Sequence, residues 1–156
     1  MSLEPFQIVP ATVQDGEWAA RWMAAHDPWD ALGLTAEACR SAAERPGSAL
    51  YVAHERDRRI GFIVLQRYGV ASAPYVQSIG VVPEARGRGV GSALLAFAED
   101  LYRGQARWLF ICVSSFNPRA RTLYERHGYT VVAELPGHLV DAASETLMRK
   151  PIAERR

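Results

Sequence analysis

Three glycines and two arginines alternate in a short segment that could bind an anion. Gly87, Gly89 and Gly91 follow Arg86 and Arg88 through this segment. If a helix starts here, its first turn offers unpaired N–H groups and the positive end of the helix dipole. Glycine lets the backbone approach a ligand closely, and arginine adds forked cationic donors. The segment therefore predicts a site for a phosphate or pyrophosphate.

The flanking residues predict a strand before this loop and a helix after it. Residues 76–82 are rich in β-branched side chains, and Pro83, which cannot donate to a ladder, should end the strand. Beyond the loop, the apolar residues recur with the period of a helix: Val90, Leu94, Phe97 and Leu101.

Two common phosphate motifs do not fit this loop. A Walker A loop ends in Gly-Lys-Ser/Thr, and the loop has no lysine. A dinucleotide fingerprint needs Gly-x-Gly-x-x-Gly, but the sixth position is Ser92 counted from Gly87 and Leu94 counted from Gly89. A nucleotide-binding domain of another class is therefore a remote alternative for this sequence.

The pattern Arg86-x-x-Gly89-x-Gly91, with Val-Val-Pro-Glu before it and Ser-Ala-Leu-Leu after it, resembles the acyl-CoA pyrophosphate loop of the GNAT superfamily of N-acetyltransferases. The alternative is a glycine-rich turn with solvated arginines, but three glycines exceed what a turn needs. The resemblance implies that this loop holds the pyrophosphate of acetyl-CoA and that the preceding strand pairs with the pantetheine amides and could stabilise an oxyanion. The cofactor-binding residues implied here are Val81, Val82, Arg86, Gly87, Arg88, Gly89, Val90, Gly91 and Ser92.

Residues 116–129 resemble the same family through the pattern Asn-x-x-Ala-x-x-Leu-Tyr-x-x-x-Gly-Tyr. The resemblance implies that Asn117 contacts the pantetheine arm and that Tyr124 is the general acid for the departing thiolate. A phenol near the leaving sulfur can donate a proton to it. The two residues are seven apart, or two helical turns, so both can face one groove. The alternatives are a plain helix cap for Asn117 and a core tyrosine for Tyr124.

No general base for the attacking amine can be singled out from the sequence. The candidates, each of which also suits a surface or loop position, are His26, His54, Glu84, Glu134 and His138. Gln77 and Ser78 on the fourth strand are not bases themselves, but either could order a water.

The acceptor site is expected in the segments that match the family least, residues 12–45 and the loop 135–143. Aromatic and acidic side chains there could line a pocket for a cationic amine, although the tryptophans could equally be core. The residues considered are Trp18, Trp22, Asp27, Trp29, Asp30, His138 and Asp141.

Composition and charge narrow the class of protein. The chain has 156 residues, 49% of them apolar and 22% charged, which predicts a single domain over residues 1–156. The resemblance implies that this is an N-acetyltransferase domain. A formal charge of +1 implies neither a nucleic-acid nor a membrane partner. Cys39 and Cys112 are lone thiols without metal-ligand spacing, so we expect no metal site and a reducing, cytoplasmic location. No secretory signal peptide and no transmembrane helix is predicted.

The predicted order of elements is β-α-α-β-β-β-α-β-α-β-β. This order predicts an α/β (α+β) fold with a mixed central sheet of about seven strands. The continuous apolar run 108–113 indicates a strand buried on both faces, and it should follow the central helix by a parallel crossover. The resemblance implies that the fourth and fifth strands are parallel and splay around the CoA cleft. Residues 68–74 are expected to form a loop.

These patterns predict an acetyl-CoA-dependent N-acetyltransferase. Acetyl would pass to a primary amine by direct attack in a ternary complex, with Tyr124 as general acid. The alternative is a non-catalytic acyl-CoA-binding sensor or regulatory module. The acceptor amine, whether small molecule or peptide, is left open. So are the tolerance of larger acyl groups and the oligomeric state, although homodimers are common in the family.

Overall fold

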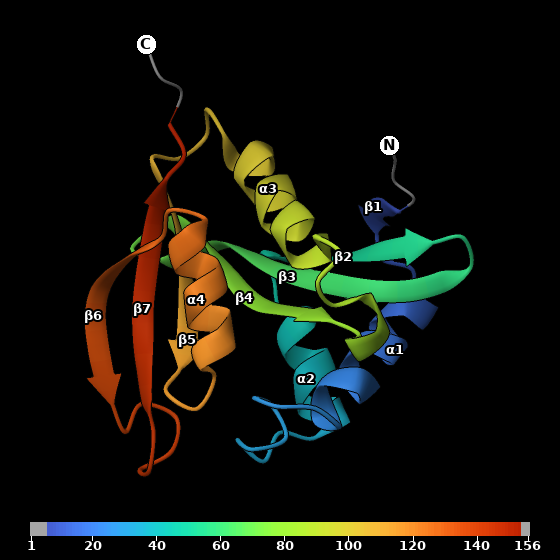
Figure 1. Cartoon of the computed structure of the whole chain (residues 1–156), viewed down its shortest axis with the longest axis horizontal. Helices are drawn as coiled ribbons and strands as arrows, with labels where there is room; N and C mark the ends of the chain where they lie inside the picture. The colour runs from blue at the N-terminus through green and yellow to red at the C-terminus, as the bar shows by residue number, and fades with distance from the viewer. Residues whose placement is uncertain (1–5, 154–156) are drawn as a thin grey trace.

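The computed structural model describes residues 6–153 and shows one seven-stranded sheet with helices on both faces (Figure 1). The spatial order of the strands is β1-β2-β3-β4-β5-β7-β6. The strands are β1 (Gln7–Pro10), β2 (Ser48–Glu55), β3 (Arg58–Val70), β4 (Ala73–Val81), β5 (Trp108–Ser114), β6 (Thr130–Pro136) and β7 (Ser144–Pro151). The helices are α1 (Val13–Ala24), α2 (Ala36–Ala43), α3 (Val90–Tyr102) and α4 (Pro118–Arg126), with a 3₁₀ turn η1 (Pro83–Ala85).

The predicted order of strands and helices is confirmed, and each face of the sheet has its own core. One core includes Ile63 and Leu65 of β3 with Leu94 of α3 and Tyr124 of α4. The other places Phe62 of β3 against α1 and α2. Alternate side chains of a strand point to opposite faces, so the apolar run of β3 is buried on both sides.

Local signals explain where the helices begin. Thr12 and Asp15 form a reciprocal capping box at the start of α1, as their spacing predicts. The Asn117 side chain accepts the Ala120 N–H at 3.3 Å, and Pro118 occupies the first turn of α4. Within residues 6–153, no helix has the length and apolar character needed to cross a membrane.

The prediction of a loop over residues 68–74 is wrong. β3 continues to Val70, β4 starts at Ala73, and the two strands pair there. The connection is a tight turn in which Ala71 and Ser72 take φ of 47° and 68°. Left-handed turn positions usually carry Gly, Asn or Asp, so this turn gives no such sequence signal.

The parallel contact between β4 and β5 is short. Only Tyr75 with Phe110 and Val76 with Ile111 are paired, whereas β5 pairs with β7 along its whole length. The β3–β4 register shifts next to Gln77, which marks a bulge at the point where β4 leaves β5. This confirms the predicted splay of the fourth and fifth strands.

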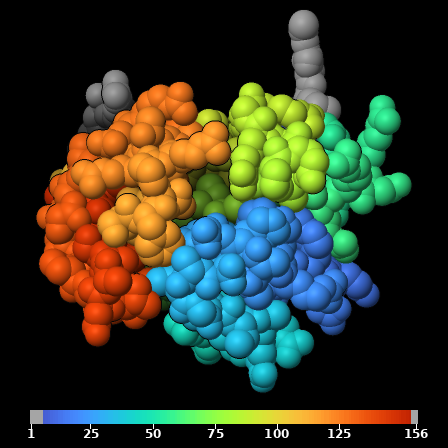
Figure 2. Space-filling view, turned by 60° about the horizontal axis from the view of Figure 1, so that its bottom comes forward, coloured from blue at the N-terminus to red at the C-terminus, as the bar shows by residue number. Residues whose placement is uncertain are grey.

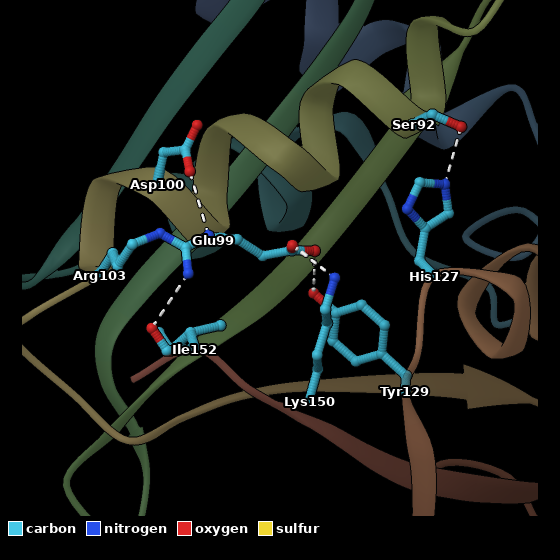
Figure 3. A network of polar contacts seen from close by, with 8 residues as sticks. All are labelled: Ser92, Glu99, Asp100, Arg103, His127, Tyr129, Lys150 and Ile152. Atoms are coloured by element: carbon cyan, nitrogen blue, oxygen red, sulfur yellow. Dashed lines mark hydrogen bonds and ion pairs between the residues drawn. The ribbon is translucent and has the colours of Figure 1, made fainter. Parts of the chain in front are cut away.

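A buried polar network fastens α3 to the second half of the sheet (Figure 3). Glu99 of α3 accepts the Tyr129 hydroxyl at 3.2 Å and pairs with Lys150 of β7 at 2.7 Å. Burial raises the pKa of Tyr129, and the neighbouring Glu99 raises it further. The network joins the C-terminal half of α3 to β7 and to the residue that precedes β6.

Candidate active site

The glycine loop has the backbone shape that its composition predicts. Gly87 and Gly89 have φ of 77° and 83°, and a Cβ at either position would meet open space. Glycine is therefore needed there for the left-handed backbone. At Gly91, a Cβ would lie 3.3 Å from Leu123 Cδ2, so this glycine allows α3 to approach α4 closely.

The first turn of α3 is open to an anion. Gly89 is its N-cap and provides no side-chain cap. The helical ladder starts with the Ala93 N–H, which donates to the Gly89 carbonyl at 2.9 Å. The preceding N–H groups of Val90, Gly91 and Ser92 have no partner among the described residues. They are the donors that a helix start offers to a phosphate.

The two arginines of the loop differ in their surroundings. Arg88 donates to both carboxylate oxygens of Glu55, at the end of β2. This pairing raises the pKa of Arg88 and lowers the pKa of Glu55. Arg86 is exposed and forms no ion pair with residues 6–153. Arg86 is thus the arginine of the loop that is available to a new anion.

A histidine that the sequence did not single out also reaches this loop. His127 Nε2, at the end of α4, lies 2.8 Å from Ser92 Oγ in the first turn of α3 (Figure 3). The contact joins the end of α4 to the first turn of α3.

The free edge of β4 faces the gap beside β5. The Val82 N–H donates to the Ile60 carbonyl at 3.0 Å, and the Val82 carbonyl accepts the Ala85 N–H at 3.0 Å. Since bonded and non-bonded pairs alternate along antiparallel strands, the backbone groups of Val81 and Ile79 point away from β3. Of the two valines predicted to pair with pantetheine, Val81 therefore has free backbone groups, whereas both groups of Val82 are used within the protein. Ile79 was not predicted.

A cavity of about 480 Å³ lies at the splay. Figure 2 shows a hollow between the orange α4 region, the yellow-green segment before α3 and the blue α1–α2 region. Tyr124 and Asn117 both line the cavity, which brings together the two predicted residues of α4. Gln77 and Ser78 of β4 line it from the other strand.

Tyr124 lies in the wall of the cavity with a hydroxyl that is unpaired among the described residues. It is buried, and residues 6–153 offer its hydroxyl no hydrogen bond. Burial raises the pKa of Tyr124, which keeps the phenol protonated at neutral pH. Asn117 uses its side-chain oxygen as the cap of α4, which leaves its amide N–H₂ free for another acceptor.

The cavity also contains a buried acid that the sequence analysis missed. Glu145, near the start of β7, lines the cavity and accepts a hydrogen bond from Ser114 at 2.7 Å. Its carboxylate lies on the same strand face as Leu147, since alternate residues share a face. The signal in the sequence was an acidic residue two positions from an apolar one on a predicted strand. The position of Glu145 in the site depends, however, on the pairing of β5 with β7.

The predicted acceptor residues divide into three groups. Trp29 lines the cavity, and its indole N–H donates to Ser78 at 3.3 Å. Trp18 and Trp22 instead pack edge-on against Phe62. The remaining predicted acceptor residues are exposed and do not line the cavity: Asp27, Asp30, His138 and Asp141.

Most of the residues considered as bases are also elsewhere. His26 stacks on Trp22, and His54 lies 3.3 Å from Asp15. Glu134 accepts a hydrogen bond from Thr146. None of these three lines the cavity, and neither does Glu84.

The comparisons with known proteins identify the family. Residues 46–131 match the family model described as "Acetyltransferase (GNAT) domain". This match covers more than half of the chain, so the protein belongs to the GNAT family of acetyltransferases.

Individual relatives agree with this family. An uncharacterized N-acetyltransferase of Bacillus subtilis (strain 168), YhfO, is 37% identical over 94 residues, which cover 55% of this chain and 61% of the relative. The match thus spans less than two thirds of that relative. The structure of a nourseothricin acetyltransferase is similar at 32% identity and a TM-score of 0.62, covering 69% of this chain and 66% of that chain.

A third similarity extends over nearly the whole chain. Arabidopsis thaliana NAA60, solved in complex with a bisubstrate analogue, has a TM-score of 0.78 and 20% identity over 94% of this chain and 97% of that chain. At 20% identity, this similarity shows the fold alone. The same plant protein has also been solved in complex with acetyl-CoA.

Proposed function

We propose that this protein is an N-acetyltransferase that moves acetyl from acetyl-CoA to a primary amine by direct attack in a ternary complex. The observation that carries the proposal is a set of three complementary features. They are the open first turn of α3, the free backbone edge of β4 at Val81 and Ile79, and the cavity lined by Ile79, Asn117 and Tyr124. The match to the GNAT family and the relative solved with acetyl-CoA support the proposal that acetyl-CoA is the acetyl donor.

Each of these features suits one section of acetyl-CoA. The N–H groups of Val90, Gly91 and Ser92, together with Arg86, would hold the pyrophosphate. The free groups of Val81 and Ile79 would pair with the pantetheine amides, because an extended amide chain completes an unpaired strand edge. The free amide of Asn117 would contact the same arm. Gly87 and Gly89 give the loop its shape, and Arg88 would contribute once released from Glu55.

Tyr124 would act on the leaving group. When the tetrahedral intermediate collapses, the C–S bond breaks and the sulfur leaves as a thiolate. The phenol would donate its proton to that sulfur, which converts the leaving group to a free thiol. A backbone N–H on the free edge of β4 would stabilise the oxyanion.

Cys112 lines the same cavity but is not suited to an acyl-enzyme. Burial raises the pKa of its thiol, which keeps it in the poorly nucleophilic protonated form. Direct attack by the amine is therefore favoured. The unpaired thiols Cys39 and Cys112 also support the expected cytoplasmic location.

The test is calorimetric binding of acetyl-CoA to the wild type and to Gly89→Asp. A carboxylate at the α3 N-cap would repel the pyrophosphate, and we expect affinity to fall by about tenfold or more. Gly104→Asp is the matched control, because Gly104 has φ of 82°, open space around its Cβ, and a position beyond the other end of α3. Absence of binding by the wild type would contradict the proposal. Binding with no acetyl transfer to any amine would favour the sensor alternative.

A further inference from the structure

Glu145 is a buried carboxylate without a cationic partner. It is 5% exposed, and its one side-chain hydrogen bond comes from the Ser114 hydroxyl. Within residues 6–153, no lysine, arginine or histidine forms an ion pair with it. A buried charge is costly unless it is paired, so a side chain of this kind suits a cationic ligand.

The carboxylate lies on the face of the sheet opposite to α3 and α4. Ser114 stands directly across from Glu145 in the β5–β7 ladder, and cross-strand partners share a face. The next position along β5, Val113, points to the other face and packs in the core that contains Tyr124. Glu145 and Tyr124 therefore reach the same cavity from opposite sides of the splayed sheet.

The rest of the wall on the Glu145 side is mostly apolar, with Arg45, which follows α2, as the cationic residue that lines the cavity. Trp29, Leu32 and Leu34 line it from the α1–α2 connection, and Leu139 lines it from the β6–β7 loop. Leu34 and Leu139 are 40% and 56% exposed, so apolar side chains border the opening. Glu145 is the acidic residue among those that line the cavity. A single buried acid with apolar walls fits an acceptor with one ammonium group on an apolar body better than a polycation.

We propose that Glu145, oriented by Ser114, binds the ammonium group of the acceptor and takes its proton, and that the acceptor is a monocationic primary amine with an apolar body. The inference rests on the proposed acetyltransferase function. It supplies the base that the sequence did not identify.

The proton balance of the step is complete. The ammonium gives one proton to Glu145, and the neutral nitrogen attacks the thioester carbon. As the intermediate collapses, the nitrogen loses a second proton to solvent, the C–S bond breaks, and Tyr124 protonates the sulfur. Glu145 then releases its proton to solvent and Tyr124 regains one. The net products are an amide, a free thiol and one proton.

The test compares Glu145→Gln with the wild type, using 2-phenylethylamine and spermidine as probe amines. We expect the wild type to prefer 2-phenylethylamine by about tenfold or more in kcat/KM. Glu145→Gln should lower kcat/KM for this amine by about 10²- to 10³-fold, since it removes both an ammonium partner and a base. Glu134→Gln, on the adjacent strand β6, is the matched control and should leave kcat/KM unchanged.

Two further readouts separate a catalytic role from a structural one. The Kd for acetyl-CoA should be the same in Glu145→Gln and the wild type, and the Tm of the variant should be equal or higher, because a buried unpaired charge has been removed. A variant with lowered Tm and weakened cofactor binding would overturn the inference in favour of a structural role.

The failure of this inference is distinguishable from failure of the proposed function. If the wild type does not bind acetyl-CoA, the acetyltransferase proposal fails. Three outcomes in a wild type that binds acetyl-CoA would overturn the inference about Glu145 alone. These are a failure to bind or acetylate 2-phenylethylamine, a preference for spermidine, or an unchanged kcat/KM in Glu145→Gln.

Discussion

Arg88 of the glycine loop donates to both carboxylate oxygens of Glu55, which ends β2. The loop proposed to hold a pyrophosphate is thus already in contact with an anionic group of the protein. A phosphate that approaches Arg88 must compete with this carboxylate.

Glu55→Gln should therefore strengthen acetyl-CoA binding. The variant keeps the shape of the side chain and removes the competing charge, so we expect Kd to fall by roughly two- to fivefold at low ionic strength. Calorimetry at low and high salt would check this, and the gain should shrink as salt screens the charges. Glu17→Gln, on the exposed side of α1, is the control. A weaker affinity in Glu55→Gln would mean instead that Glu55 holds Arg88 in its binding position.

Tyr124→Phe should lower kcat by about 10²-fold without changing acetyl-CoA affinity, because it removes a proton donor to the leaving sulfur and keeps the ring. Stopped assays of thiol release, with calorimetry of acetyl-CoA, would separate the two quantities. Tyr129→Phe is the matched control: it removes a hydroxyl bonded to Glu99 and should cost about 1 kcal/mol of stability while leaving kcat unchanged. Equal kcat values for the wild type and Tyr124→Phe would reduce Tyr124 to a core residue.

Asp15 should make stability depend on acidic pH. Burial would raise the pKa of Asp15, but the Arg59 hydrogen bond, the Thr12 N–H and the nearby His54 outweigh it and lower the pKa from 3.8 to about 2. A lowered carboxyl pKa adds stability that is fully present above the unfolded value and is lost as pH falls toward the folded value. The contribution is about 2 kcal/mol at neutral pH and should disappear between about pH 4 and 2.

Urea unfolding of the wild type and Asp15→Asn across this pH range would check the prediction. The free energies of unfolding should differ at pH 7 and converge as pH falls below about 4. A difference that stayed constant with pH would show that the capping hydrogen bonds, rather than the charge, account for the effect.

Asp30→Asn should leave the acceptor KM unchanged, in contrast to the hypothesis that this carboxylate attracts the amine. Asp30 is exposed and does not line the cavity, so its charge is largely screened at a distance. Steady-state kinetics with 2-phenylethylamine would check this beside Glu145→Gln. A raised KM in Asp30→Asn would restore the α1–α2 connection as the cationic recognition site.

Much of the fold and the local shape of the glycine loop and of the helix starts were predictable because their signals are local. The glycines of the loop, the Asn117 cap and the Thr12 capping box each act within a few residues of sequence, and the structure shows the local geometry expected of each. The order of strands and helices followed from apolar periodicity. The turn at Ala71 and Ser72 was missed because neither residue type is typical of a left-handed backbone.

The contacts that were missed depend on pairing between distant segments. Glu55 and Arg88 are 33 positions apart, and Ser114 and Glu145 are 31 apart. Nothing near Glu145 in the sequence indicates that β7 lies beside β5, or that a gap opens next to β5. Likewise, Ile79 has free backbone groups and Val82 does not, because of which residue pairs in the β3–β4 ladder are hydrogen-bonded.

The two residue pairs that join β4 to β5 make the sheet mechanically discontinuous. Strands β1–β4 form one part of the sheet, and β5, β7 and β6 form the other. Bending at the boundary between the two parts breaks few hydrogen bonds, so we expect the sheet to be most flexible there. A pantetheine chain bound along β4 would add hydrogen bonds at this boundary, so the bound substrate would make the sheet more rigid during the reaction.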